Sequence, residues 1–343
     1  MSMAKYAFRR LIAAIPVLFG VLTMTFILSR LMPGDPVQAR LDLQGIARPS
    51  PSVYRQMSHQ LGLDLPIILQ YFRYLGDLFT GNWGRSVSIA RNSPVWELIM
   101  AKLPRTIDLT IFSMIIAAYV GTKIGVISAT NRNKAKDTIF RGMALIGVAV
   151  PIFFLGMLLQ YTIAYQTPIF PATQYKNMDF MDPAQVTGFY WLDALIAGEL
   201  YKIPDYFYHL ILPVFCLSFV TIASIVRQTR SSMLEVLEQD YVRTARAKGC
   251  KEKTVIHSHA LKNALIPTVT VIGLNVAGLL GGAVLTETTF GLNGIGMLLV
   301  DSIVLVDYWV IDALVFVITL IFIVTTLITD LLYGILDPRI RFN

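Results

Sequence analysis

Six stretches of this sequence are rich in apolar residues and contain no Asp, Glu, Lys or Arg. A helix needs about 20 mostly apolar residues, within a range of about 17–25, to cross the hydrocarbon core of a bilayer. Only 15% of the chain is charged, whereas soluble domains are about one quarter charged, so a soluble fold is disfavoured. The pattern predicts an all-α integral membrane protein with six transmembrane helices, which contain the runs Leu11–Ser29, Leu109–Thr122, Gly142–Tyr165, Leu210–Val226, Asn263–Thr286 and Ala313–Thr329.

The Lys and Arg residues of the connecting segments predict the orientation of these helices. Residues 131–136 hold three cations and residues 227–262 hold eight, whereas residues 290–308 hold none. Cytoplasmic loops carry an excess of Lys and Arg near the ends of membrane helices. We therefore expect both termini and the basic stretch Asp240–Pro267 to be cytoplasmic. The formal net charge of +7 then reflects membrane topology, and no nucleic-acid partner is expected.

The same pattern divides the chain into four parts. Residues 1–31 are expected to form the cytoplasmic N-terminus and the first transmembrane helix, which we interpret as a retained anchor. Residues 32–104 form an outer segment whose mixture of apolar, aromatic and charged residues indicates interfacial helices, or alternatively a small outer subdomain. Residues 105–335 contain spans two to six together with a cytoplasmic loop at 231–266, and residues 336–343 form a cytoplasmic tail.

The basic stretch is expected to contain a helix of about two turns. Asp240 can cap its N-terminus, and Gly249 can end it in a left-handed conformation. Pro267 would then open the next span. One face of the helix combines an aromatic ring, small residues and a cation, at Tyr241, Thr244, Ala245 and Lys248. Arg243 and Arg246 flank this face and can pair with acids on the rim of a partner's groove. The alternative is a cytoplasmic hairpin whose cations only determine the topology.

The fifth apolar run carries a stripe of small and polar residues. Asn275, Gly278 and Gly282 are spaced to share one helix face, and an Asn inside the membrane must face protein or water. The stripe indicates either close helix packing within this chain or the wall of a pathway between two subunits. Glu287 follows at the outer end of the run, where we expect a solvated charge or a gate residue.

Motifs for catalysis and for metal or nucleotide binding are absent from the sequence. It lacks G-x-x-x-x-G-K-[ST], H-E-x-x-H and G-x-S-x-G, so no catalytic, cofactor-binding or metal-binding residue is predicted. His257 and His259 are two residues apart and would point to different faces of a helix. An ion-coupled secondary transporter remains an alternative, although such proteins commonly place ionisable groups at the midplane, where these runs have none.

Several motifs nevertheless resemble one family in their exact residues and order. "RTARAKG" at 243–249 and "HALKNALIP" at 259–267 resemble the cytoplasmic loop of permease subunits of ABC importers, although Arg243 and Thr244 replace the Glu and Ala of the general pattern. The dipeptide/oligopeptide branch of that family has similar departures. Further similar motifs are "PGDP" at 33–36, "GNWGRS" at 81–86, "LTETTFGLNGIG" at 285–296 and "DLLYGILDPRIR" at 330–341.

This resemblance implies a type I ABC importer permease fold in the plasma (inner) membrane of a prokaryote. It implies that Tyr241–Gly249 is a coupling helix that docks onto ATPase subunits, with close approach at Thr244, Ala245 and Gly249. The implied partners are a second homologous permease, two ATP-binding cassette subunits and an extracytoplasmic solute-binding protein. ATP and Mg²⁺ would bind to the ATPase subunits, and this chain would bind no cofactor. Peptides are the expected cargo, with oligosaccharides or metal chelates as alternatives.

Overall fold

The computed structural model describes residues 3–32, 34–90 and 92–336. Throughout these residues the regular structure is helical, and the strand-like pairing is confined to a single bridge between Arg85 and Pro94. The elements are α1 (Met3–Leu31), α2 (Pro36–Leu43), α3 (Pro51–Leu61), α4 (Ile67–Thr80), α5 (Val95–Thr130), α6 (Ala135–Ala149), α7 (Ile152–Leu159), the π-helix η1 (Gln160–Gln166), α8 (Tyr190–Ile196), α9 (Lys202–Leu237), α10 (Asp240–Ala247), α11 (Glu252–Thr254), the π-helix η2 (Val255–Ala260), α12 (Leu261–Phe290), α13 (Ile295–Val304) and α14 (Tyr308–Leu336).

All six apolar runs lie in helical segments, but only four of these segments are single helices long and apolar enough to cross a membrane. These four are α1, α5, α9 and α14. The other two segments are broken: α6 and α7–η1 meet at 104°, and the segment that ends in α12 bends by 56° between Val276 and Gly281. Length and composition therefore give four spans, or up to six if each bent pair is one span.

Prolines account for one of these breaks but do not interrupt the other long helices. Pro151 separates α6 from α7, where it lacks an N–H and disfavours helical backbone in the residue before it. Pro213 lies inside α9, which remains one helix of 36 residues. The prediction that Pro267 opens a span is wrong, because α12 begins at Leu261 and continues from η2.

The two longest helices, α5 and α9, pack closely through glycine. A Cβ atom on Gly121 would lie 2.8 Å from Ile225 Cβ, and one on Gly125 would lie 2.6 Å from Thr229 Cβ. Both glycines therefore allow the helices to approach more closely than any side chain would permit, as small residues do at interfaces between membrane helices.

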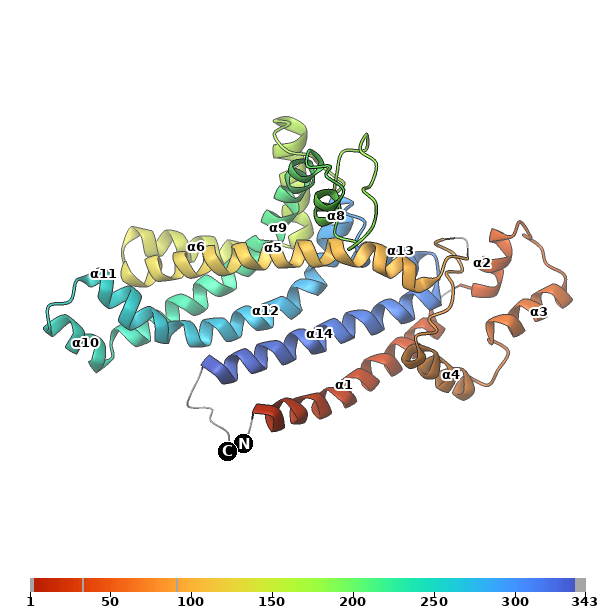
Figure 1. The fold of residues 1–343 in the computed structure, drawn as a ribbon, viewed down its shortest axis with the longest axis horizontal. Helices are drawn as coiled ribbons and strands as arrows, with labels where there is room; N and C mark the ends of the chain where they lie inside the picture. Colours follow the sequence, from red (N-terminus) through yellow and green to blue (C-terminus); the bar gives the residue numbers. More distant parts are fainter. Residues whose placement is uncertain (1–2, 33, 91, 337–343) are drawn as a thin grey trace.

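α1 and α14 form a second pair whose ends lie together. Arg10, near the start of α1, is 3.2 Å from Asp330, near the end of α14. Figure 1 shows these two helix ends in the half of the molecule that carries α10 and α11, whereas α2 and α3 lie at the opposite end. The first and last described helix ends are thus on the side of α10.

Residues 32–104, which the sequence predicts to be an outer segment, contain three short helices, α2 to α4. Its last part is attached to the core by Asp307, which is fully buried between α13 and α14. Asp307 Oδ2 accepts hydrogen bonds from Ser86 Oγ at 2.6 Å and from the backbone N–H groups of Val87 and Ser88, both at 2.9 Å. This carboxylate fixes the loop that leads into α5.

Candidate functional site

α10 forms where the sequence predicts a short helix, with one change at its N-terminus. The N-cap residue is Gln239, whose backbone is extended (ψ 149°), and Asp240 is the first helical residue. Asp240 therefore lies in the first turn, where its negative charge interacts favourably with the positive end of the helix dipole. Its predicted role as N-cap is wrong. The predicted end is confirmed: Gly249 has φ +77° just beyond the last turn.

One side of α10 faces the interior of the chain. Val242 is fully buried and Ala245 is 7% exposed. They contribute to an apolar cluster with residues from α5, α9, η2 and α12, namely Val126, Ala129, Met233, Val255, Ala260 and Ala264. The expectation that Ala245 lies on a partner-facing surface is wrong, because this cluster already covers it. Ala245 was therefore grouped wrongly with Tyr241, Thr244 and Lys248, because it points to the interior of the chain.

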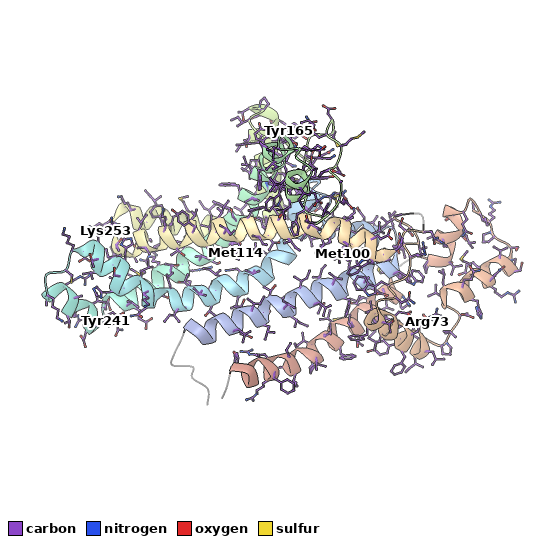
Figure 2. The ribbon with its side chains drawn as sticks, viewed as in Figure 1. Arg73, Met100, Met114, Tyr165, Tyr241 and Lys253 are labelled. Carbon is purple, nitrogen blue, oxygen red and sulfur yellow. The ribbon has the colours of Figure 1, made fainter. Side chains whose placement is uncertain are left out.

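The opposite side of α10 is exposed. Tyr241, Arg243, Thr244 and Lys248 are all exposed. Arg243 lies 3.4 Å from Asp240 in an exposed pair, which holds it only weakly. The Tyr241 hydroxyl accepts a hydrogen bond of 2.8 Å from Asn263 Nδ2, at the start of α12. In Figure 2, Tyr241 and Lys253 lie at the tip of the molecule. This surface is open to a partner.

Arg246 has a different environment from the other cations of α10. It donates two hydrogen bonds to the Glu252 carboxylate, from Nη2 at 2.9 Å and from Nε at 3.2 Å. A bidentate pair fixes the guanidinium in one orientation. Arg246 therefore closes the turn between α10 and α11, which makes it a support of the helix more than a free docking group.

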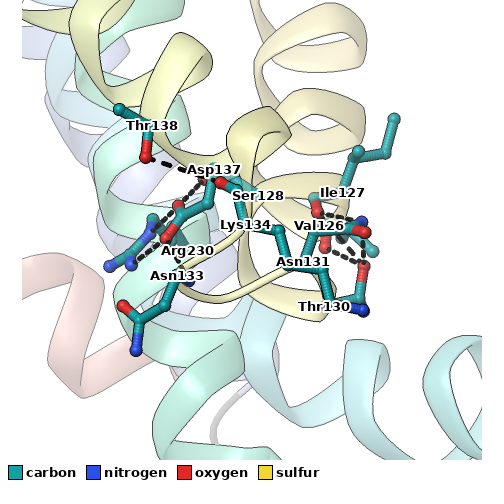
Figure 3. Close-up of polar contacts among 10 residues, drawn as sticks. All are labelled: Val126, Ile127, Ser128, Thr130, Asn131, Asn133, Lys134, Asp137, Thr138 and Arg230. Carbon is teal, nitrogen blue, oxygen red and sulfur yellow. Dashed lines mark hydrogen bonds and ion pairs between the residues drawn. The ribbon is translucent and has the colours of Figure 1, made fainter.

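A buried ion pair fixes the neighbouring turn between α5 and α6 to α9 (Figure 3). Asp137, whose side chain is 1% exposed, lies 2.7 Å from Arg230 Nε and 2.8 Å from Arg230 Nη2. Asp137 also accepts hydrogen bonds from Ser128 Oγ at 2.6 Å and from the Asn133 backbone N–H at 3.1 Å. The two Arg230 contacts attach this turn to the end of α9 that precedes α10, whereas the Ser128 and Asn133 contacts hold Asp137 within the turn.

Sequence reasoning did not identify Asp137 and Arg230 as a functional pair. Both residues lie beside apolar runs in segments that the positive-inside rule already explained. Their contact joins positions 93 residues apart, and nothing in the local sequence indicates that separation. The available signal was a charge four or five residues from the end of an apolar run.

The stripe on α12 is divided by the structure. Asn275 Nδ2 donates to Ser224 Oγ of α9 at 2.9 Å, and a Cβ on Gly282 would lie 3.2 Å from Leu217 Cδ1 of α9. Gly278 is exposed, and a Cβ there would meet no described atom within 4 Å. Asn275 and Gly282 thus pack within the chain, while Gly278 faces away from it.

Glu287 is not the solvated charge that was expected. It is fully buried at the end of α12 and accepts hydrogen bonds from the backbone N–H groups of Gly296 at 2.8 Å and Met297 at 3.1 Å. Thr106 Oγ1 of α5 donates to its other oxygen. The carboxylate therefore caps the N-terminus of α13 and joins it to α5 and α12.

The chain resembles known proteins over its whole length. Residues 121–342 match the family described as binding-protein-dependent transport system inner membrane component, and residues 3–110 match the N-terminal part of such membrane components. The chain is 43% identical to the dipeptide transport system permease protein DppB of Alkalihalophilus pseudofirmus, over 99% of this chain and 100% of the relative. It is 40% identical to DppB of Escherichia coli K12, over 99% of each chain. It is 36% identical to the oligopeptide transport system permease protein AppB of Bacillus subtilis, over 99% of this chain and 100% of the relative.

These matches agree with the apolar helices, and the protein is a multi-pass protein of the plasma membrane. The predicted family resemblance is confirmed. With both family matches and full-length relatives above 30% identity, the chain belongs to the inner membrane components of binding-protein-dependent transport systems.

Proposed function

We propose that this chain is the permease subunit of an ATP-driven importer and forms half of the translocation pathway for di- and oligopeptides. The observation that carries the proposal is the full-length similarity to permeases named for dipeptide and oligopeptide transport. A second homologous permease would supply the other half of the pathway. A solute-binding protein would deliver peptides to the outer face.

The exposed side of α10 is the proposed docking surface for the ATPase subunits. ATP and Mg²⁺ bind to those subunits in this proposal, and α10 transmits their movement to the membrane helices. The cluster behind Val242 and Ala245 supports this role because it attaches α10 to α9. The pair Asp137–Arg230 supports it further because it fixes α9 to the turn between α5 and α6. Tyr241, Arg243, Thr244 and Lys248 present the contact groups.

The proposed topology has six spans with both termini in the cytoplasm. This topology counts each bent segment as one span. It is supported by the start of α1 and the end of α14, which lie together in the same half of the molecule as α10. Residues 1–31 then hold the N-terminus and first span, residues 32–104 the outer segment, residues 105–335 the remaining spans with the loop 231–266, and residues 336–343 the tail.

A peptide uptake assay tests the proposal. A strain that lacks its own peptide importers and requires an amino acid is supplied with the complete importer and a dipeptide that contains this amino acid. We expect growth with the wild type. Thr244→Trp places a large ring on the exposed side of α10, and we expect it to abolish uptake while the chain still inserts in the membrane.

Lys134→Trp is the matched control, since Lys134 is exposed in the turn between α5 and α6, on the same half of the molecule. We expect the control to retain uptake. Full uptake with Thr244→Trp would remove α10 from the proposed contact, and failure of the wild type to take up any peptide would refute the function itself.

A further inference from the structure

A polar cavity lies far from α10, between α1, α4 and the start of α14. Its volume is about 240 Å³, and its walls include Arg30, Gln70, Arg73, Asp77, Tyr308 and Asp312. Figure 2 shows Arg73 at the end of the molecule opposite to Tyr241 and Lys253. Pockets for drug-sized ligands have volumes of about 300–1,000 Å³, so this cavity suits a smaller solute.

Asp312 lines this cavity with an unpartnered oxygen. The residue is 7% exposed, and its Oδ1 atom accepts no hydrogen bond from any described residue. Buried polar atoms are nearly always hydrogen-bonded, and a buried carboxylate oxygen without a donor is costly. An ammonium group in the cavity would supply the missing donor.

Arg30 provides the opposite charge in the same cavity. Its guanidinium carbon lies over two rings, 4.8 Å from the centroid of Phe26 and 5.1 Å from that of Tyr308. It donates from Nε to Gln70 Oε1 at 3.2 Å and from Nη1 to Ser29 Oγ at 3.5 Å. Among the hydrogen bonds of the described residues, Nη2 has no acceptor. The rings therefore orient a guanidinium that has capacity for an anion.

Arg30 and Asp312 act on each other electrostatically, but no ion pair joins them among the described residues. If Arg30 and Asp312 served only to neutralise each other inside the protein, we would expect them to form a direct ion pair. Instead, both residues line the same cavity, and each has one polar atom without a hydrogen-bond partner among the described residues. At the exposed rim of the cavity, a second Arg and Asp form an ion pair, with Arg73 Nε 3.8 Å from Asp77 Oδ2. The cavity thus offers separate sites for a positive and a negative group.

We infer that this cavity binds a small zwitterion, a short peptide with free ends, with its ammonium group at Asp312 and its carboxylate at Arg30. The inference rests on the proposed function, to which it adds a peptide site in the permease itself at the end opposite α10. Recognition of both ends by charge would accept many side chains while excluding peptides with blocked ends.

Binding of radiolabelled dialanine to the assembled importer without its solute-binding protein tests the inference. The importer is placed in phosphatidylglycerol nanodiscs, whose lipid headgroups carry no ammonium group, and binding is measured by equilibrium dialysis. We expect saturable binding of dialanine. N-acetyl-dialanine and dialanine amide should compete at least about tenfold more weakly, because each loses one charge-assisted hydrogen-bonding group.

Asp312→Asn and Arg30→Gln should weaken dialanine binding by roughly ten- to hundredfold. Asp330→Asn and Arg10→Gln are matched controls, because this pair joins the same two helices at their other ends. We expect both controls to bind like the wild type. The blocked peptides test the site on wild-type protein, so the inference stays falsifiable even if a variant fails to fold.

Several results would overturn the inference. These are the absence of dialanine binding, equal competition by blocked peptides, or unchanged affinity in folded Asp312→Asn protein. Loss of dialanine binding in nanodiscs that contain phosphatidylethanolamine would assign the cavity to a lipid headgroup and also overturn it. Peptide uptake by the wild-type importer without such binding would refute this site alone, whereas absence of uptake would refute the proposed function.

Discussion

Replacement of Asp137 by Asn is expected to destabilise the protein strongly. Asp137 accepts four hydrogen bonds, two of which come from the Arg230 guanidinium at 2.7 and 2.8 Å. The Asn side chain has nearly the same size but carries no charge, and its NH₂ group cannot accept from Arg230. Breaking a buried ion pair on one side costs about 3–5 kcal/mol. The Arg230 side chain that loses its partner is 20% exposed, so we expect a loss near the lower end of this range.

An exposed ion pair between the same two regions provides the comparison. Arg132 Nη1 lies 3.0 Å from Glu238 Oε1, and these side chains are 56% and 67% exposed. Such pairs contribute about 0–1 kcal/mol. Glu238→Gln therefore removes a contact between the α5–α6 turn and the end of α9 at small cost, while Asp137→Asn removes its buried counterpart.

Equilibrium unfolding of the purified chain in mixed micelles, with increasing sodium dodecyl sulfate, measures both free-energy changes. We expect Asp137→Asn to lower the free energy of unfolding by several kcal/mol more than Glu238→Gln does. In a double-mutant cycle, Arg230→Gln should cost much less in the Asp137→Asn background than in the wild type. Equal effects of the two single variants, within about 1 kcal/mol, would refute the reasoning from burial.

Two further predictions concern stability at other sites. Gly125→Ala should destabilise the protein by about 1–3 kcal/mol, because its Cβ would overlap Thr229. Gly142 has open space around it, so Gly142→Ala should be neutral or stabilise α6 by up to about 1 kcal/mol. The same unfolding assay compares the two variants, and equal losses of stability would contradict the packing argument. Asp193 is buried, which would raise its pKa, but hydrogen bonds from Thr187 and neighbouring backbone N–H groups hold the pKa below its usual value. The ionised Asp193 therefore contributes to the free energy of unfolding above the unfolded pKa of about 3.9, and this stability is lost as the pH falls through the lower folded pKa. When unfolding is measured against pH, Asp193→Asn should lose less stability in acid than the wild type does. An unchanged pH profile would contradict this role of Asp193.

The sequence identified the apolar segments reliably because hydrophobicity is a local property. All six predicted runs lie in helical segments, and one of them, Gly142–Tyr165, is interrupted between Ala149 and Ile152. The straightness of those helices was not predictable in the same way. Pro151 accounts for the position of one break, but the apolar pattern does not give the 104° angle there, and the bend near Val276 occurs without a proline.

The candidate site was predictable in position but less so in orientation. The glycine signal placed the end of α10 correctly at Gly249. The inward direction of Ala245 was missed, because helical periodicity shows which residues share a face but not which partner covers that face. Glu287 was misjudged for a similar reason, since its hydrogen-bond donor Thr106 is 181 residues away in sequence. Contacts of that range follow from the assembled fold and not from local pattern.

The close contact of α5 and α9 determines which parts of the chain can move separately. Gly121 and Gly125 contribute no side chain to this contact, so Ile225 and Thr229 of α9 pack directly on the α5 backbone, and sliding or rotation of one helix would drive these side chains into the other helix. The two helices therefore behave as one rigid body, and α10 at the end of α9 is carried with it. Hinge movement is left to the joints between straight segments, at Pro151 and near Val276.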